Sequence, residues 1–249
     1  MKNFFKIIWI CILLSSCIRF PKNTIAEKNQ IIDSEGIDTI PSPYNEDNKI
    51  YITNRTFVYQ VYQNNINRKY NFIIELKVIP GSCNSGQTKI KYKYFYRKEE
   101  LTPDEIIAFE YSDSLGGYCR QEITGVIENN IEIWLHPPRT KTLIKLEKAP
   151  FPEIKFNSKE WNETLVIPFG NYKEIGLSGS IIKWNYKIDS IKYIHDTIPY
   201  YCSIKAVATS KKGGRNTLDA VFKADSGMVK LNYFFEDKST VKFVLKEIK

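Results

Sequence analysis

The sequence predicts an all-β fold, and three observations support this prediction. From Ile50 onward, short runs alternate apolar and polar residues with a period of two, which is typical of strands with one buried face. Aromatic residues make up 14% of the chain, with 16 tyrosines and 14 phenylalanines, and such residues are enriched in strands. Only two methionines are present, which indicates little helical packing.

The alternation is clearest in the C-terminal third. Its apolar positions are Ile182, Trp184, Tyr186 and Ile188; Cys202, Ile204, Ala206 and Ala208; Leu218, Ala220 and Phe222; Val229, Leu231, Tyr233 and Phe235; and Val241, Phe243 and Leu245. Turn residues separate these runs at Gly213-Gly214, at 225–227 and at 236–239. We therefore expect an antiparallel meander that forms a curved sheet, a half-barrel or a barrel-like sandwich.

The middle of the chain adds two more strand patterns and one helix. Ile90, Tyr92, Tyr94 and Tyr96 alternate with three lysines, and Asn129-Asn130 suits a hairpin turn. After that turn, Ile131, Ile133 and Leu135 alternate with Glu132, Trp134 and His136, so we expect a half-buried strand. Thr102-Pro103-Asp104-Glu105 predicts the start of one short helix that ends before Ser112, because Thr102 can cap it and Pro103 suits its first turn.

The first residues have the layout of a secretory signal. Residues 1–6 carry two lysines, residues 7–14 are continuously apolar, and Ser15 and Ser16 are small. An apolar run of this length is far short of the ~20 residues that cross a membrane as a helix. Leu14-Ser15-Ser16-Cys17 resembles the lipobox of bacterial lipoproteins. The resemblance implies that the Cys17 thiol is joined to diacylglycerol and that Cys17 becomes the first residue of the mature chain.

These patterns divide the chain into three parts. We expect a signal peptide over residues 1–16, a lipidated cysteine and flexible tether over 17–49, and a single antiparallel β domain over 50–249. The tether is polar, contains Pro21, Pro41 and Pro43 and has no sustained periodicity.

Three short motifs mark the second half of the chain. They are Trp134–Arg139 (WLHPPR), Pro150–Pro152 (PFP) and Gly227–Tyr233 (GMVKLNY). This pattern resembles that of uncharacterised Bacteroidetes-type lipoproteins with a C-terminal β domain of unknown function, over about residues 125–249. The resemblance offers no catalytic residues to carry over. In such lipoproteins an acidic cluster after the lipidated cysteine is associated with export to the cell surface, whereas Ile18–Lys22 is basic and apolar. We therefore expect an outer-membrane position that faces the periplasm.

The cysteines after Cys17 allow at most one internal disulfide. Cys83 and Cys119 lie in glycine-containing loops, and we expect them to be bonded in an oxidising compartment. Cys202 lies on an apolar strand face, which predicts a small buried side chain. The alternative is a reactive thiol paired with His136 or His195.

Two groups of side chains are candidates for binding. His136 and Arg139 follow a strand that ends at two prolines, and they either line a binding site or form a satisfied pair at the strand end. Lys89, Lys91 and Lys93 form a stripe beside tyrosines. The stripe could hold a polyanion such as lipopolysaccharide phosphates or an acidic glycan. Its alternative is a solvated strand face or an edge guarded by lysines against aggregation.

These observations favour a membrane-anchored lipoprotein of the cell envelope that acts as a non-enzymatic binding or assembly module for an apolar, glycan or protein ligand. The alternative is an envelope hydrolase acting on glycan or lipid, which requires groups such as His136, His195, Asp196 or Glu122 to meet in one cleft. Neither an H-E-x-x-H nor a C-x-x-C motif is present, so we expect no metal and no cofactor. The net charge of +8 has no long basic run, and we expect no nucleic-acid partner.

Overall fold

The computed structural model describes residues 48–65, 68–82, 87–96, 121–140, 142–170, 176–194, 198–210 and 214–249. All of them belong to one compact unit, Asp38–Lys249. The expected helix after Thr102 lies outside these residues, as do the signal peptide and the predicted tether up to residue 47. Within the described ranges, no helix is long and apolar enough to cross a membrane.

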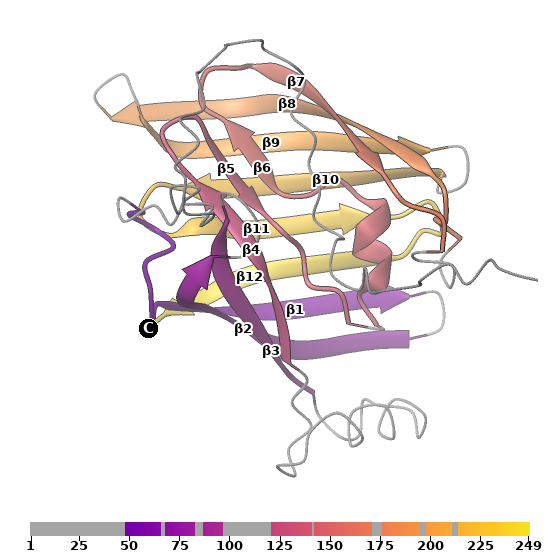
Figure 1. Cartoon of the computed structure of the whole chain (residues 1–249), viewed down its shortest axis with the longest axis horizontal. Coiled ribbons are helices and arrows are strands. Elements are labelled where there is room, and N and C mark those ends of the chain that lie inside the picture. Colours follow the sequence, from indigo (N-terminus) through magenta and orange to yellow (C-terminus); the bar gives the residue numbers. More distant parts are fainter. Residues whose placement is uncertain are drawn as a thin grey trace, which may run out of the picture. The chain divides into compact units, whose positions relative to one another are not determined.

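Twelve strands form one antiparallel, barrel-like sheet, which confirms the predicted all-β fold (Figure 1). In chain order they are β1 (Thr56–Asn65), β2 (Arg68–Ser82), β3 (Thr88–Phe95), β4 (Gln121–Glu128), β5 (Glu132–Leu135), β6 (Glu153–Lys155), β7 (Glu160–Val166), β8 (Ile181–Ile194), β9 (Ile198–Ser210), β10 (Gly214–Lys223), β11 (Gly227–Phe234) and β12 (Thr240–Ile248). Their order across the sheet is β6-β5-β4-β3-β2-β1-β12-β11-β10-β9-β8-β7.

The C-terminal meander β8–β12 follows the predicted alternation, with one exception. Leu231 and Tyr233 of β11 are buried as expected, but the next inward position is Met228 rather than Val229. The register changes there, because Val221 pairs with Lys230 whereas Phe222 pairs with Met228. Val229 is therefore the extra residue of a β-bulge. The bulge shifts the inward-facing positions between Val229 and the start of β11 by one residue.

Strand β5 departs from the expected half-buried pattern. Ile133, Trp134, Leu135 and the following His136 are all buried, so both faces of the strand are covered. The reason is tertiary packing. Trp134 and His136 both contact Phe151, whose ring lies 4.7 Å from that of Trp184 in β8. In Figure 1, β5 and β6 accordingly lie across the long strands β8 to β10.

The two edge strands of the sheet come together without a backbone ladder. Lys155 of β6 forms an ion pair with Glu163 of β7, and Lys155 Nζ also lies 3.6 Å from Glu153 Oε1. Tyr186 of β8 donates a hydrogen bond to the Phe151 carbonyl at 3.0 Å. Side chains therefore nearly close the sheet into a barrel.

Hydrogen bonds from consecutive backbone N–H groups to one carboxylate fix the start of the described domain. The Glu128 carboxylate accepts hydrogen bonds from the backbone N–H groups of Lys49, Ile50 and Tyr51 at 2.8–3.0 Å. Asn48 donates to the Thr88 hydroxyl at 2.9 Å. Contacts with the sheet therefore extend back to residue 48, and a single carboxylate at the end of β4 satisfies three consecutive donors.

Candidate functional site

His136 and Arg139, predicted from the sequence as one candidate, lie close together in the structure. Both follow β5, and both approach Glu147 of the 3-10 helix η2 (Ile144–Lys148), the one helical element among the described residues. The distance to Glu147 Oε1 is 3.8 Å from His136 Nε2 and 3.9 Å from Arg139 Nε. The segment after β5 therefore brings an imidazole, a guanidinium and a carboxylate together inside the domain.

Arg139 is held most closely by Glu122 of β4. Its Nε lies 2.7 Å from Glu122 Oε1, and its backbone N–H donates to Oε2 at 2.7 Å. The Tyr94 hydroxyl donates to the same Oε2 at 2.7 Å. The side chains of Arg139 and Glu122 are 19% and 14% exposed, so this charge-assisted pair is mostly shielded from water.

His136 is fully buried and is held as the neutral imidazole. Its Nδ1 donates to the Pro137 carbonyl at 2.7 Å, and since a carbonyl can only accept, Nδ1 carries the proton. Nε2 has no hydrogen-bond partner among the described residues. Burial, followed by the positive charge of Arg139, lowers the pKa of His136 to about 3. The Tyr92 hydroxyl fixes the backbone at this point by donating to the His136 carbonyl at 2.7 Å.

A group of tyrosine hydroxyls extends the buried polar region across the sheet. Tyr59 of β1 donates to the Met228 carbonyl at 2.8 Å, and burial raises the pKa of Tyr59 well above its usual value. Burial also raises the pKa of Tyr233 in β11, and the charge of Glu147 adds to this effect. The pKa of Tyr92 is raised by burial and then by the nearby Tyr59, Glu122, Tyr51 and Tyr233. All these hydroxyls therefore stay protonated at neutral pH.

The pattern of inward tyrosines could have revealed this group from the sequence. Tyr92, Tyr94 and Tyr233 occupy apolar positions of alternating runs, and a buried tyrosine hydroxyl usually needs a polar partner. Glu147 could not be found in this way, because it lies in a short helical turn without periodicity.

The buried region has the properties of a polar core. His136 is 0% exposed and Glu147 1%, so neither side chain can reach a molecule in solution. Within the described residues, no group of three or more His, Cys, Asp or Glu side chains could hold a metal ion. The network joins β3, β4, the segment after β5 and η2.

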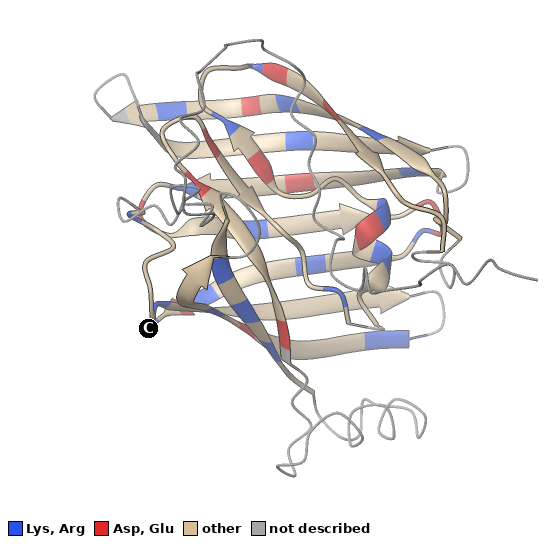
Figure 2. Cartoon of the chain, viewed as in Figure 1, with Lys and Arg blue, Asp and Glu red and all other residues tan. Residues whose placement is uncertain are grey.

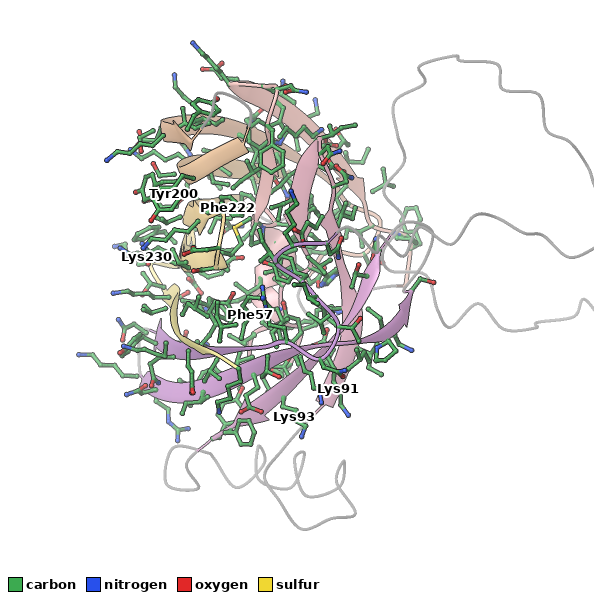
Figure 3. The ribbon with its side chains drawn as sticks, turned by 90° about the vertical axis from the view of Figure 1, so that its left-hand side faces the viewer. Phe57, Lys91, Lys93, Tyr200, Phe222 and Lys230 are labelled. Atoms are coloured by element: carbon green, nitrogen blue, oxygen red, sulfur yellow. The ribbon has the colours of Figure 1, made fainter. Side chains whose placement is uncertain are left out.

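The second candidate, the lysine stripe of Lys89, Lys91 and Lys93, lies on the outside of β3. Figure 3 shows Lys91 and Lys93 pointing away from the interior, whereas Phe57 and Phe222 point into it. By register, Lys91 lies between Lys77 of β2 and Ile123 of β4, and Lys93 faces Glu75. Figure 2 shows that basic residues also occur on most other strands, in agreement with a charge that is spread along the sequence.

The predicted covalent sites fall outside the described residues. They are Cys17, Cys83 and Cys119. The lipidation of Cys17 and the disulfide between Cys83 and Cys119 therefore stay predictions. Cys202 is a free thiol on β9 with no exposed surface, as its apolar strand face predicts. Burial raises its pKa to about 12, which makes it unreactive at neutral pH.

No protein-family model matches the chain, and no curated protein matches it. Among solved structures, the chain is similar to a predicted exported protein with a YmcC-like fold from Bacteroides fragilis, with 7% identity and a TM-score of 0.36 over 80% of this chain and 96% of that one. It is also similar to a predicted lipoprotein from Parabacteroides distasonis, with 12% identity and a TM-score of 0.33 over 80% and 97% of the two chains. A third likeness, with 12% identity and a TM-score of 0.33 over 78% and 84%, is to a predicted outer-membrane lipoprotein-sorting protein domain from Vibrio parahaemolyticus. Similarity at this level carries no conclusion about function.

Proposed function

We propose that this chain is a lipoprotein of the bacterial cell envelope, held on a membrane by acyl chains on Cys17. The observation that carries the proposal is Leu14-Ser15-Ser16-Cys17, placed directly after a basic start and a short apolar run. One acyl chain binds a membrane only reversibly, whereas several chains anchor a protein firmly. The proposed location is the outer membrane with the β domain facing the periplasm, because residues 18–22 are basic and apolar.

The β domain, in this proposal, binds a partner and does not convert a substrate. A general base must come within hydrogen-bond reach of the proton that it abstracts. Of the groups that an envelope hydrolase would need, His136 is fully enclosed, whereas His195 and Asp196 lie outside the described residues. Glu122 is occupied by two donors of Arg139 and by Tyr94. This packing favours binding over hydrolysis.

The lysine stripe is the proposed binding surface, and its ligand is anionic, such as lipid phosphates or an acidic glycan. Lys91 is paired across the sheet with Lys77, and like charges directly opposite each other destabilise a sheet. Lys89 faces Gly125, which adds no compensating charge. A negative ligand would relieve the repulsion between Lys77 and Lys91, and such a charge cluster attracts anions from solution.

Metabolic labelling with a fatty acid tests the anchor. Full-length protein is expressed in a bacterium as the parent chain, as Cys17→Ser and as Cys11→Ala, which removes the other cysteine of the N-terminal segment. We expect label in the parent and in Cys11→Ala and its loss in Cys17→Ser. Equal labelling of the parent and Cys17→Ser would refute lipidation at this position.

A further inference from the structure

The β7–β8 hairpin presents a tip of exposed apolar side chains. Val166, the last residue of β7, pairs directly with Ile181, the first residue of β8, and these side chains are 53% and 57% exposed. Phe169, three residues beyond Val166, is 89% exposed, the highest value among the exposed large apolar residues of the described chain. We call Val166, Phe169 and Ile181 the apolar tip.

The backbone around the tip is fixed by hydrogen bonds and by two buried anchors. Ile167 and Leu177 are 3% and 0% exposed, and the Ile167 N–H donates to the Ser180 carbonyl at 2.8 Å. Phe169 lies against Gly179, which has a φ of +66°, and a Cβ on Gly179 would lie 2.4 Å from the Phe169 ring. A phenylalanine presented on a hydrogen-bonded backbone requires little rearrangement of that backbone when a partner covers its side chain.

Basic side chains flank the tip on the exposed face of the sheet. Lys183 lies two residues beyond Ile181 on the same face, and its cross-strand neighbours are Thr164 and Thr209. Arg215, which is exposed, continues the same row as the partner of Thr209. An apolar tip bordered by cations has the chemistry of a segment that enters the interface of an anionic membrane.

We propose that the apolar tip inserts into the interface of the membrane that carries the acylated Cys17, a step that rests on the proposed lipidation. The described chain begins at Asn48, which binds Thr88 at the start of β3. The strand register places Asn48 and Thr88 at one end of the sheet and the apolar tip at the opposite end. Residues 18–47 can span at most about 100 Å when extended. The 14 residues of β8 span roughly 46 Å. The anchor and the tip can therefore reach one membrane together.

Tryptophan fluorescence tests the insertion. The mature lipoprotein is purified from cells that express the full-length chain and is reconstituted into phosphatidylglycerol-containing vesicles with and without brominated lipid. The variants are Phe169→Trp and, as a matched control, Ile131→Trp, which is 61% exposed at the other end of the sheet. The native Trp134, Trp161 and Trp184 are 5–7% exposed and give a constant background.

We expect the emission from position 169 to shift to shorter wavelength and to be quenched by brominated lipid, while the emission from position 131 changes little. Phe169→Trp combined with Lys183→Glu should show weaker quenching in anionic vesicles. Unquenched emission from position 169 would overturn the proposal. Equal quenching at both positions would overturn it as well, and so would a shift that depends on protein density without quenching, because that result indicates a second copy of the chain. Acylation is measured on the same samples by mass, so a failure of lipidation at Cys17 is distinguished from a failure of the tip to insert.

Discussion

Arg139 is bound by Glu122 at two points, since its Nε and its backbone N–H each donate to a different carboxylate oxygen at 2.7 Å. Glu122 belongs to β4, whereas Arg139 lies beyond the end of β5. The pair therefore fixes the path of the chain as it leaves the sheet after the two prolines, and it places the segment that leads to η2.

Replacing Glu122 by Gln should therefore destabilise the domain. The substitution removes the charge that balances Arg139 but keeps the shape of the side chain. Removing one partner of a buried ion pair is strongly destabilising, and with the partial exposure of this pair we expect a loss of about 2 kcal/mol. Urea denaturation measures it. Asp189→Asn is the matched control, because the Asp189–Lys205 pair is 50% and 60% exposed and should contribute less than about 1 kcal/mol. Equal losses in both variants would contradict the structural role of Glu122.

His136 should make the domain less stable as the pH falls. The pKa of His136 is about 3 in the folded protein and about 6.5 in an unfolded chain. Between these values the unfolded state binds a proton that the folded state does not, so the free energy of unfolding rises with pH. This contribution is complete above pH 6.5 and falls by about 2 kcal/mol between pH 6.5 and about pH 5.

The measurement compares the parent with His136→Asn over this pH window. Other groups titrate in both proteins, so the difference between them isolates the imidazole. We expect the difference in the free energy of unfolding between the parent and His136→Asn to decrease by about 2 kcal/mol as the pH is lowered from 6.5 to about 5. A constant difference would show that His136 is accessible to protons in the folded state.

The strands with one buried face could be predicted from the sequence, because side chains alternate between the two faces of a strand and apolar residues therefore recur at every second position. β3 and the C-terminal meander show this, with Ile90, Tyr92 and Tyr94 facing the core and the lysine stripe outside. The bulge at Val229 could not be predicted, because an inserted residue changes the alternation without changing residue type. The prediction for β5 was wrong for another reason, because Phe151 covers the face of the strand that the local pattern assigns to solvent.

The candidate site could be predicted only in part, because local sequence signals determine some of its features and long-range packing determines the others. The two prolines after His136 indicate where β5 ends, and this placed His136 and Arg139 beside each other. The burial of His136 and its approach to Glu147 depend on how η2 folds back over the sheet, which no local pattern encodes. The order β6 to β7 across the sheet likewise results from long-range pairing of β1 with β12.

Two glycines with nearly the same backbone conformation should respond differently to alanine. Gly227 has a φ of +72° and Gly176 a φ of +73°, and both conformations are unfavourable for alanine by about 1 kcal/mol. A Cβ on Gly227 would lie 2.9 Å from the Tyr51 hydroxyl and 3.0 Å from Ile50, whereas a Cβ on Gly176 would have no atom of the described residues within 4 Å. Gly227→Ala should therefore lose roughly 1–3 kcal/mol more than Gly176→Ala. Thermal or urea unfolding of the two variants measures the difference. Equal losses of stability in the two variants would show that the Ile50-Tyr51 segment can move to accommodate the Cβ without loss of free energy.

The lysine stripe allows stability and binding to be separated. Lys91→Glu places opposite charges across from Lys77, so we expect a gain of about 0.2–1 kcal/mol in the free energy of unfolding. Lys93→Glu is the matched control, because it faces Glu75 and should lose a similar amount. If the stripe binds anions, both variants should bind a sulfated dextran probe more weakly than the parent, although their stabilities change in opposite directions. Dextran binding that follows stability, or that is unchanged in both variants, would identify the stripe as an ordinary solvated strand face.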